Sequence, residues 1–300
     1  MRSLLFVPGD SPRKLEKAFA SKADVLLIDL EDSVAPGAKA EARAVTLGFL
    51  EEAVAETVRP RLFVRVNALD TGLIDADLDG VMAARPDGIM LPKSRSGSDV
   101  THLDVKIAVR EATFDLPDGG TRILIVATET ASSLFEMGTY RGASRRLAGM
   151  AWGGEDLAAD IGASRNRDDD GRYRDPYRLA RSLCLLGAVA AGATPIDSVY
   201  TNFRDETGLR AEAMLAMEDG FTAKMAIHPA QVAVINEVFT PNPAAIARAR
   251  AIIAAFAEAG DAGVVGLDGE MLDRPHLKQA EKILDRARLA GMAESAFPKS

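Results

Sequence analysis

The chain has 300 residues and a formal net charge of −8, and 47% of its residues are hydrophobic and 27% are charged. This composition is typical of a globular protein with a large core, and the acidic balance argues against a general nucleic-acid surface. No apolar run approaches the ~20 residues of a membrane-spanning helix, and Gly9 and Asp10 end the first apolar stretch too early for a signal peptide. We therefore expect a cytoplasmic protein that binds neither nucleic acid nor membrane. Its one cysteine, Cys184, lies among leucines and is predicted to be a buried, inert thiol.

Eight short apolar runs, most of them separated by amphipathic helical stretches, indicate the architecture. Two of them, Val25–Ile28 and Ile123–Val126, are apolar at every position, as in strands buried on both faces of a parallel sheet. Eight strand-plus-helix units predict an α/β fold, the closed (β/α)8 TIM barrel, in which all strands end at one mouth that holds the active site. The runs are Ser3–Gly9, Val25–Asp32, Leu62–Asn67, Gly88–Lys93, Arg122–Glu129, Leu147–Asp156, Thr194–Tyr200 and Ala223–His228.

Helices are expected between these strands. Ser11 is a predicted N-cap before a helix over residues 13–21, and Asp175 is a predicted N-cap before a helix over residues 177–191 that ends near Gly192. A long charged loop, Arg165–Arg174, follows the sixth strand, and such loops on the strand-exit side often serve as lids. The further helical stretches cover residues 33–59, 70–85, 97–114 and 203–219.

The last sixty residues are predicted to form an appendage to the barrel. Pro241 and Pro243 begin a helix that continues to about residue 260, residues 264–270 form a short turn or hairpin, and residues 276–289 form a last helix. We therefore expect a catalytic barrel over residues 1–240 and a C-terminal helical extension over residues 241–300.

Polar side chains follow most of the predicted strands, at the end that forms the mouth. Two carboxylates at adjacent strand ends, with positions left for water and ligand, suit a hard divalent cation such as Mg2+. Only three histidines are present, which argues against a histidine-rich zinc or iron site. The residues are Asp29, Glu31, Asp32, Arg65, Asn67, Lys93, Glu129, Glu155, Asp156 and His228.

The same charges could instead form salt bridges at the barrel rim. Asp29 and Asp32 suit a supporting role toward Arg65. Lys93 suits structural pairing with a carboxylate, and His228 suits a cap on its strand. A functional role is favoured for Glu129, which stands alone after an apolar strand, and for Asp156, which follows two glycines that permit close backbone approach to a ligand.

Seven segments, in chain order, resemble the citrate lyase β-subunit-like, or HpcH/HpaI aldolase, family. The similarity runs from the first strand to the last helix and is greatest to free-standing acyl-CoA lyases such as malyl-CoA and citramalyl-CoA lyases. The resemblance implies a magnesium-dependent barrel that assembles as a homotrimer or hexamer. The segments are Leu4–Gly9, Asp29–Val34, Val64–Asn67, Met90–Lys93, Glu129–Ala131, Gly153–Leu157 and Lys224–Gln231.

Carried over residue by residue, the resemblance implies a role for each matching position. Glu129 and Asp156 hold Mg2+, or Mn2+ in its place. Arg65 is catalytic and contacts the carboxylate and carbonyl end of the substrate. Asp273, in a C-terminal lid motif, reaches the active site of a neighbouring subunit and acts there as acid or base. The substrate-binding positions are Phe6, Val7 and Lys17 along the CoA channel, Arg65, Glu129, Glu155 and Asp156 at the reacting end, and Ile227 and His228 beside the pantetheine arm.

The implied reaction is reversible carbon–carbon cleavage of a carboxylated 3-hydroxyacyl-CoA to an acyl-CoA and a 2-oxo acid, glyoxylate or pyruvate. The sequence leaves three alternatives open: a citrate lyase β subunit that acts on a citryl-carrier protein, a malyl-CoA thioesterase, and a barrel that binds CoA without catalysis. A pyruvate aldolase that acts without CoA is disfavoured, because those relatives use a histidine base near the second strand and this chain has no histidine before His102.

Overall fold

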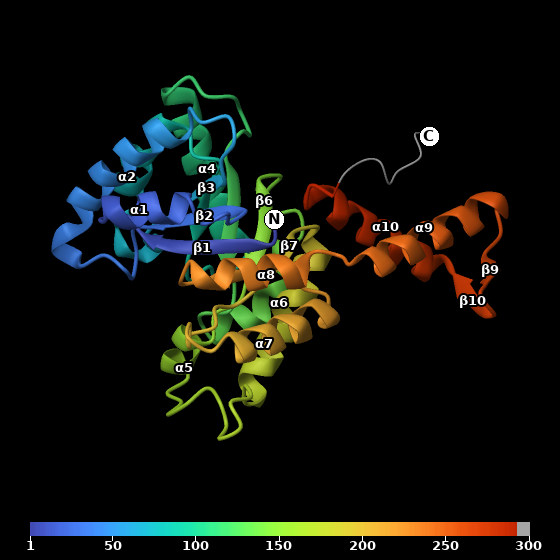
Figure 1. The fold of residues 1–300 in the computed structure, drawn as a ribbon. Helices are drawn as coiled ribbons and strands as arrows, with labels where there is room; N and C mark the ends of the chain where they lie inside the picture. Colours follow the sequence, from blue (N-terminus) through green and yellow to red (C-terminus); the bar gives the residue numbers. More distant parts are fainter. Residues whose placement is uncertain (293–300) are drawn as a thin grey trace.

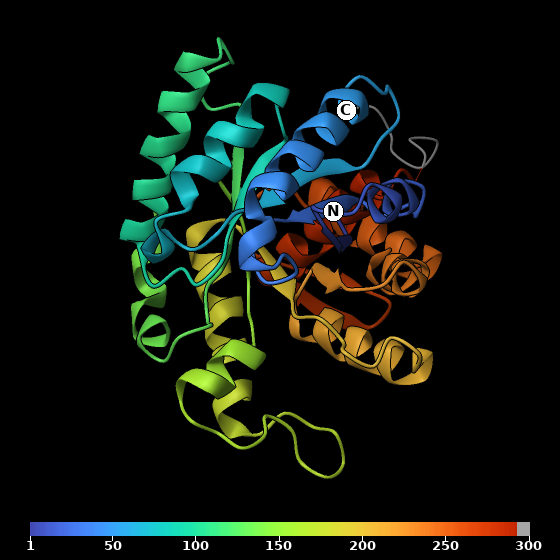
Figure 2. The same ribbon diagram turned by 90° about the vertical axis from the view of Figure 1, so that its left-hand side faces the viewer.

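The structure, a computed structural model, describes residues 1–292. Eight parallel strands pair in chain order, and β1 pairs with both β2 and β8, which closes the barrel. This arrangement, seen in Figures 1 and 2, confirms the predicted (β/α)8 fold. The strands are β1 Ser3–Pro8, β2 Val25–Asp29, β3 Arg61–Arg65, β4 Gly88–Leu91, β5 Arg122–Val126, β6 Leu147–Ala151, β7 Thr194–Asp197 and β8 Ala223–Ala226.

Helices cover the outside of the barrel (Figure 2). After β5 the chain forms a 3-10 helix, η4 (Ser132–Tyr140), where the other long connections have α-helices. The α-helices are α1 Pro12–Phe19, α2 Lys39–Ala53, α3 Ile74–Val81, α4 Gly97–Thr113, α5 Glu155–Asp160, α6 Asp175–Ala191, α7 Glu206–Asp219 and α8 Ala230–Phe239, and the short 3-10 turns are η1 Pro36–Ala38, η2 Leu69–Thr71 and η3 Met82–Ala84.

Three predicted helices begin at different residues in the structure, for local reasons. Within residues 33–59 the only α-helix is α2, which starts at Lys39 because Pro36 begins a separate 3-10 turn before it. Helix α7 begins only at Glu206, since the side chain of Asp205 caps it by accepting a hydrogen bond from Gly208 N at 2.9 Å. The N-cap of α6 is Arg174 rather than the predicted Asp175, which is the first helical residue. Gly192 ends this helix as predicted, and it adopts the left-handed conformation.

The core has an inner and an outer layer, because successive side chains of a barrel strand point to opposite faces. The inner layer fills the barrel and includes Leu27, Phe63, Met90 and Leu124. The outer layer lies between the strands and the helices, and it includes the predicted buried thiol, Cys184. The barrel interior is therefore packed with side chains, and ligands can reach polar groups only at the rim.

The C-terminal appendage extends from one side of the barrel (Figure 1). The change from barrel to appendage falls between Phe239 and Pro243. The appendage consists of α9 Pro243–Glu258, β9 Val264–Leu267, β10 Glu270–Asp273 and α10 Arg274–Leu289, and the two strands form the expected hairpin. These elements share a small hydrophobic cluster of their own. Residues 293–300 of the predicted extension lie outside the described residues.

No helix within residues 1–292 is both long enough and apolar enough to cross a membrane.

Candidate active site

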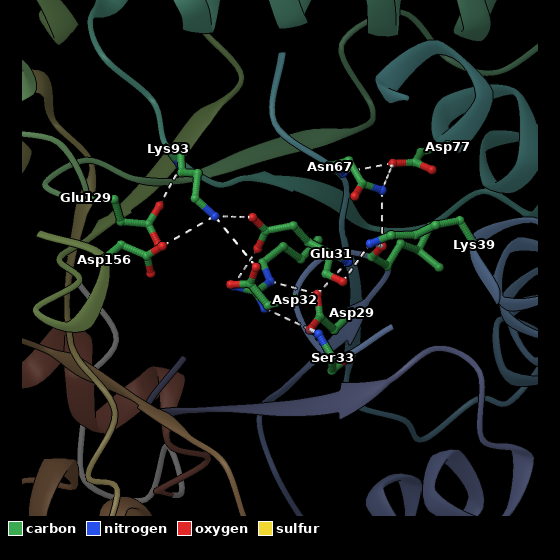
Figure 3. A network of polar contacts seen from close by, with 12 residues as sticks. Asp29, Glu31, Asp32, Ser33, Lys39, Asn67, Asp77, Lys93, Glu129 and Asp156 are labelled. Atoms are coloured by element: carbon green, nitrogen blue, oxygen red, sulfur yellow. Dashed lines mark hydrogen bonds and ion pairs between the residues drawn. The ribbon is translucent and has the colours of Figure 1, made fainter. Parts of the chain in front are cut away.

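The carboxyl ends of β2, β3 and β4 bring a charged cluster together at the barrel rim (Figure 3). Arg65, at the end of β3, donates two hydrogen bonds to Asp29, at the end of β2, both at 2.7 Å. Burial opposes the charge of Asp29, but the bonds from Arg65 hold the pKa of this carboxyl below its ordinary value. The predicted supporting role of Asp29 toward Arg65 matches this geometry.

Hydrogen bonds on the side away from the mouth hold the loop after β2, so that Glu31 faces the mouth. Asp29 accepts a hydrogen bond from Glu31 N at 2.9 Å, and Lys39 donates to the carbonyls of Leu30 and Glu31, both at 2.7 Å. Asn67, after β3, donates to Leu30 O at 3.0 Å. The predicted rim residue Asn67 therefore holds the loop and does not face the charged cluster (Figure 3).

Lys93, after β4, lies between the two acidic sides of the mouth (Figure 3). Its ammonium contacts Glu31 and lies 3.6 Å from Asp32 and 3.4 Å from Asp156. Its backbone has a φ of +52°, an uncommon conformation for a residue other than glycine, and its N–H donates to Glu129. Lys93 thus contacts both predicted metal-binding carboxylates, and the expected pairing of Lys93 with carboxylates is confirmed.

Glu129, after β5, and Asp156, in the first turn of α5, lie beside each other at the opposite side of this cluster (Figure 3). Glu129 is 5% exposed. Burial raises the pKa of Glu129 to about 8, and the negative charge of Asp156 adds to the effect. When both are ionised, the carboxylates of buried Glu129 and partly exposed Asp156 repel each other, and a cation would relieve that repulsion.

The donor set fits a hard divalent cation. Within residues 1–292, no three histidine, cysteine or acidic side chains form a complete metal cage, so Glu129 and Asp156 would supply two oxygen ligands only. Mg2+ is commonly held in this way, by one or two carboxylates together with water and substrate oxygens. Gly153 keeps the space beside Glu129 open, because a Cβ at Gly153 would lie 2.9 Å from Glu129 Cγ.

The residues predicted to line a CoA channel differ in exposure. The ring of Phe6 lies under the guanidinium of Arg65, 4.7 Å from it. Val7 is 3% exposed and packs in the outer core layer, so only its backbone is available to a ligand. Lys17 is exposed on α1. The CoA channel itself stays a prediction.

The other predicted ligand-binding residues lie on the rim at β6 and β8. Glu155 is exposed and accepts a hydrogen bond from Asn166 at 2.7 Å, so it faces the 165–174 loop. Ile227 is exposed after β8. The ring of His228 stacks on Phe203 at 4.6 Å, and its Nδ1 accepts a hydrogen bond from Ala230 N. The side chain of His228 therefore binds the first backbone N–H of α8, while its ring remains at the surface.

Asp273 does not reach the mouth of its own barrel. It ends β10 and caps α10, and its carboxylate contacts the ring of His276. The appendage that carries it extends outward from the barrel (Figure 1). Any role of Asp273 in catalysis would therefore have to be in another subunit.

A groove of about 1460 Å³ lies on the side of the barrel, between α6, α7 and the 167–175 loop. Its lining mixes arginines, acids and leucines, among them Arg181, Glu212 and Leu186. The groove does not include Glu129, Asp156 or Arg65, so the converging charges of the mouth, and not the size of a cavity, mark the candidate active site.

Sequence reasoning missed a second charged cluster behind the mouth, formed by Asp197, Lys224 and the indole of Trp152. All three are at most 1% exposed. A signal was present, because Asp197 and Lys224 interrupt the apolar runs of β7 and β8, and ionised side chains are seldom fully buried without a partner.

Comparison with known proteins identifies the family of the chain. The sequence profile of the HpcH/HpaI aldolase/citrate lyase family matches residues 2–229. The chain belongs to this family. Because this is a family of CoA-ester and citryl lyases, the protein is an enzyme of the lyase type.

Three relatives span nearly the whole chain. A (3S)-malyl-CoA thioesterase of Cereibacter sphaeroides is 39% identical over 95% of this chain and 94% of its own length. An L-malyl-CoA/beta-methylmalyl-CoA lyase of the same species is 35% identical over 96% of this chain and 95% of its own. The crystal structure of CitE from Mycobacterium tuberculosis, in complex with magnesium, acetoacetate and coenzyme A, superimposes with a TM-score of 0.74 at 33% identity, covering 96% of this chain and 98% of that one.

Proposed function

We propose that this protein is a magnesium-dependent lyase that cleaves a carboxylated 3-hydroxyacyl-CoA, of the malyl-CoA, β-methylmalyl-CoA or citramalyl-CoA type, to an acyl-CoA and a 2-oxo acid. One observation carries the proposal: the barrel mouth brings the carboxylates of Glu129 and Asp156 together and places the guanidinium of Arg65 in the facing cluster. The lyase relative and the CitE complex with magnesium and coenzyme A support it.

Glu129 and Asp156 would hold Mg2+, or Mn2+ in its place. The chemistry that the ion supplies when bound is Lewis-acid polarisation of the oxygens of the hydroxyl and carboxylate that become the 2-oxo acid. Lys93, which contacts both carboxylates, would keep them aimed at the mouth and add positive charge beside the anionic substrate.

Arg65 would stabilise the negative charge that develops as the carbon–carbon bond breaks. A guanidinium has five N–H donors, and Asp29 accepts two of those of Arg65. A third nitrogen, Nη1, lies 3.0 Å from Glu31. Donors therefore remain for the oxyanion of the acyl-CoA enolate, and the bidentate contact with Asp29 fixes their direction before the substrate arrives.

A proton must then reach the enolate carbon, and we assign this step to Asp273 of a neighbouring copy. Within its own chain Asp273 lies on the outward appendage, where it is half exposed and contacts His276 in its cap. A homotrimer or hexamer would bring it to the next mouth. Because the appendage has its own core, it can present Asp273 without rearranging the barrel.

The test is a cleavage assay that follows two products at once. Malyl-CoA, β-methylmalyl-CoA, citramalyl-CoA and citryl-CoA are each supplied with Mg2+ or with EDTA, and 2-oxo acid and free CoA thiol are measured. A lyase releases a 2-oxo acid without free thiol: glyoxylate from malyl-CoA and β-methylmalyl-CoA, pyruvate from citramalyl-CoA, or oxaloacetate from citryl-CoA. We expect EDTA to abolish turnover and Mg2+ to restore it. Full activity of the double variant Glu129→Gln with Asp156→Asn would refute the metal assignment.

A second candidate, a malyl-CoA thioesterase, is favoured by the 39% identical relative. It would release malate and free thiol, with no 2-oxo acid, so the same assay separates the two reactions. Turnover of a citryl group only on a carrier protein would indicate a citrate lyase β subunit. Binding of CoA esters in a calorimeter without turnover of any donor would indicate a CoA-binding barrel without catalysis.

A further inference from the structure

A fully buried ion pair lies on the outer face of β7 and β8, behind the mouth. Lys224 is 0% exposed, and its ammonium donates to Asp197 at 2.6 Å, to the carbonyl of Ser198 at 2.8 Å and to Glu212 at 3.0 Å. All three of its donors are used. Burial of such a pair contributes little net stability, because desolvation offsets the attraction between the charges. Its presence in the core therefore calls for an explanation other than stability.

The pair holds one specific side chain. Asp197 uses its other oxygen to accept a hydrogen bond from Trp152 Nε1 at 2.7 Å, and Arg181 lies 3.4 Å from the same oxygen. Burial opposes the charge of Asp197, yet the cations of Lys224 and Arg181 hold its pKa below the ordinary value. Asp197 therefore stays an ionised acceptor that fixes the orientation of the indole. Trp152 is the only tryptophan of the chain.

Trp152 in turn supports the turn that places both predicted metal ligands. A Cβ at Gly154 would lie 3.2 Å from the indole, so the ring packs directly against this glycine. Gly153 N donates to Thr128 Oγ1 at 3.0 Å, which ties the turn to the residue before Glu129. The next turn of chain begins α5, which carries Asp156. The indole thus packs against the turn that precedes Asp156, and the same turn is hydrogen-bonded to the residue before Glu129.

We infer that Asp197, oriented by Lys224, is a positioning residue that acts through Trp152 to hold Glu129 and Asp156 at the spacing needed for a divalent cation. An apolar side chain at position 197 could fill the same space, but it could not fix the rotation of the indole. The inference rests on the proposed function, since it assigns the two carboxylates to the metal.

The test compares two double variants that bury no unpaired lysine. Lys224→Met with Asp197→Asn keeps an amide oxygen that can accept from Trp152, whereas Lys224→Met with Asp197→Leu has a similar branched shape and no acceptor. Isothermal titration with Mn2+ measures metal affinity directly, without turnover. We expect the leucine variant to bind Mn2+ at least ~10-fold more weakly than the asparagine variant, as for other groups that orient metal ligands. Equal affinities of the two would overturn the inference.

Trp152→Phe provides a second measurement that leaves the Asp197–Lys224 pair intact. It removes the N–H donor and keeps most of the aromatic surface, and we expect the same ~10-fold loss of Mn2+ affinity. A Kd within twofold of the wild type would contradict the inference even if the double variants failed to fold.

Glu111→Gln is the matched control for destabilisation alone. Glu111 and Arg146 form another buried pair, 2% and 6% exposed at their side chains, at the opposite end of the barrel strands. We expect this variant to lose stability but to keep the wild-type affinity for Mn2+. If the wild-type protein itself does not bind Mn2+ or Mg2+, the proposed function fails; if it binds and Trp152→Phe binds equally well, only the positioning role fails.

Discussion

Both ends of the barrel bring acidic and basic side chains together, but the pKa values of their buried glutamates shift in opposite directions. At the amino ends of the strands, Glu111 accepts two hydrogen bonds from Arg146, both at 2.7 Å, and two more from backbone N–H groups. Burial opposes its charge, but these bonds hold the pKa of Glu111 below its ordinary value. At the carboxyl ends, burial raises the pKa of both Glu31 and Glu129.

This difference separates charged groups that are paired within the chain from charged groups that are available to a ligand. At the amino end, the charged groups of Glu111 and Arg146 are paired within the chain and need no ligand. The carboxyl end holds the buried carboxyl of Glu129 beside that of Asp156, an arrangement that a bound cation would relieve. Catalytic groups of TIM barrels lie at the carboxyl end, and the amino end contributes mainly stability.

The largest expected effect tests the amino end. Glu111→Gln leaves the guanidinium of Arg146 buried without its full partner, and breaking a buried pair from one side costs about 3–5 kcal/mol of unfolding free energy. Urea denaturation measures this loss. The folded variant should keep the wild-type kcat, and a large drop in kcat would show that the two ends are not separate in function.

Next in size is the loss of a catalytic cation from the carboxyl end. Arg65→Gln should lower kcat by ~10²–10³, because it removes a donor aimed at a developing oxyanion. Lys106→Gln, which removes a cation from a pair with Asp75 on the helical surface, is the control and should leave kcat unchanged. An Arg65→Gln enzyme of wild-type activity would remove Arg65 from the mechanism.

Glu129→Gln should separate activity from stability. The variant removes a carboxylate whose charge is opposed first by burial and then by Asp156. In EDTA at pH 8 we therefore expect its unfolding free energy to equal or exceed that of the wild type, by up to about 3 kcal/mol. Its turnover with Mg2+ should be lost. A metal-free variant that is clearly less stable than the wild type would show that the carboxyl end is not strained by like charges.

The smallest effect is the pH dependence of the amino end. The pKa of Glu111 is lowered in the folded protein from an ordinary value of 4.5, so its stabilising contribution is present above about pH 4.5 and is lost as the pH falls through the folded pKa. Thermal denaturation from pH 7 to pH 3 should therefore show a steeper loss of Tm for the wild type than for Glu111→Gln. Parallel curves would contradict the assignment.

The sequence by itself determined the barrel and the list of groups at its mouth. Apolar runs without alternation identify strands buried on both faces, and parallel strands in chain order must end at one rim. That rule alone placed Glu129, Asp156 and Arg65 near one another. The position of Gly192 also identified where α6 ends.

The tertiary structure alone decided which of those groups face each other. Val7 belongs to a strand that reaches the mouth, yet its side chain packs toward the helices. Lys93 contacts both Glu31 and Asp156 because β4, which it follows, lies between β2 and β6 in the order of strands around the rim. Trp152 and Asp197 are 45 residues apart and meet across adjacent strands. Such contacts depend on barrel closure and side-chain direction, which no local pattern in the chain encodes.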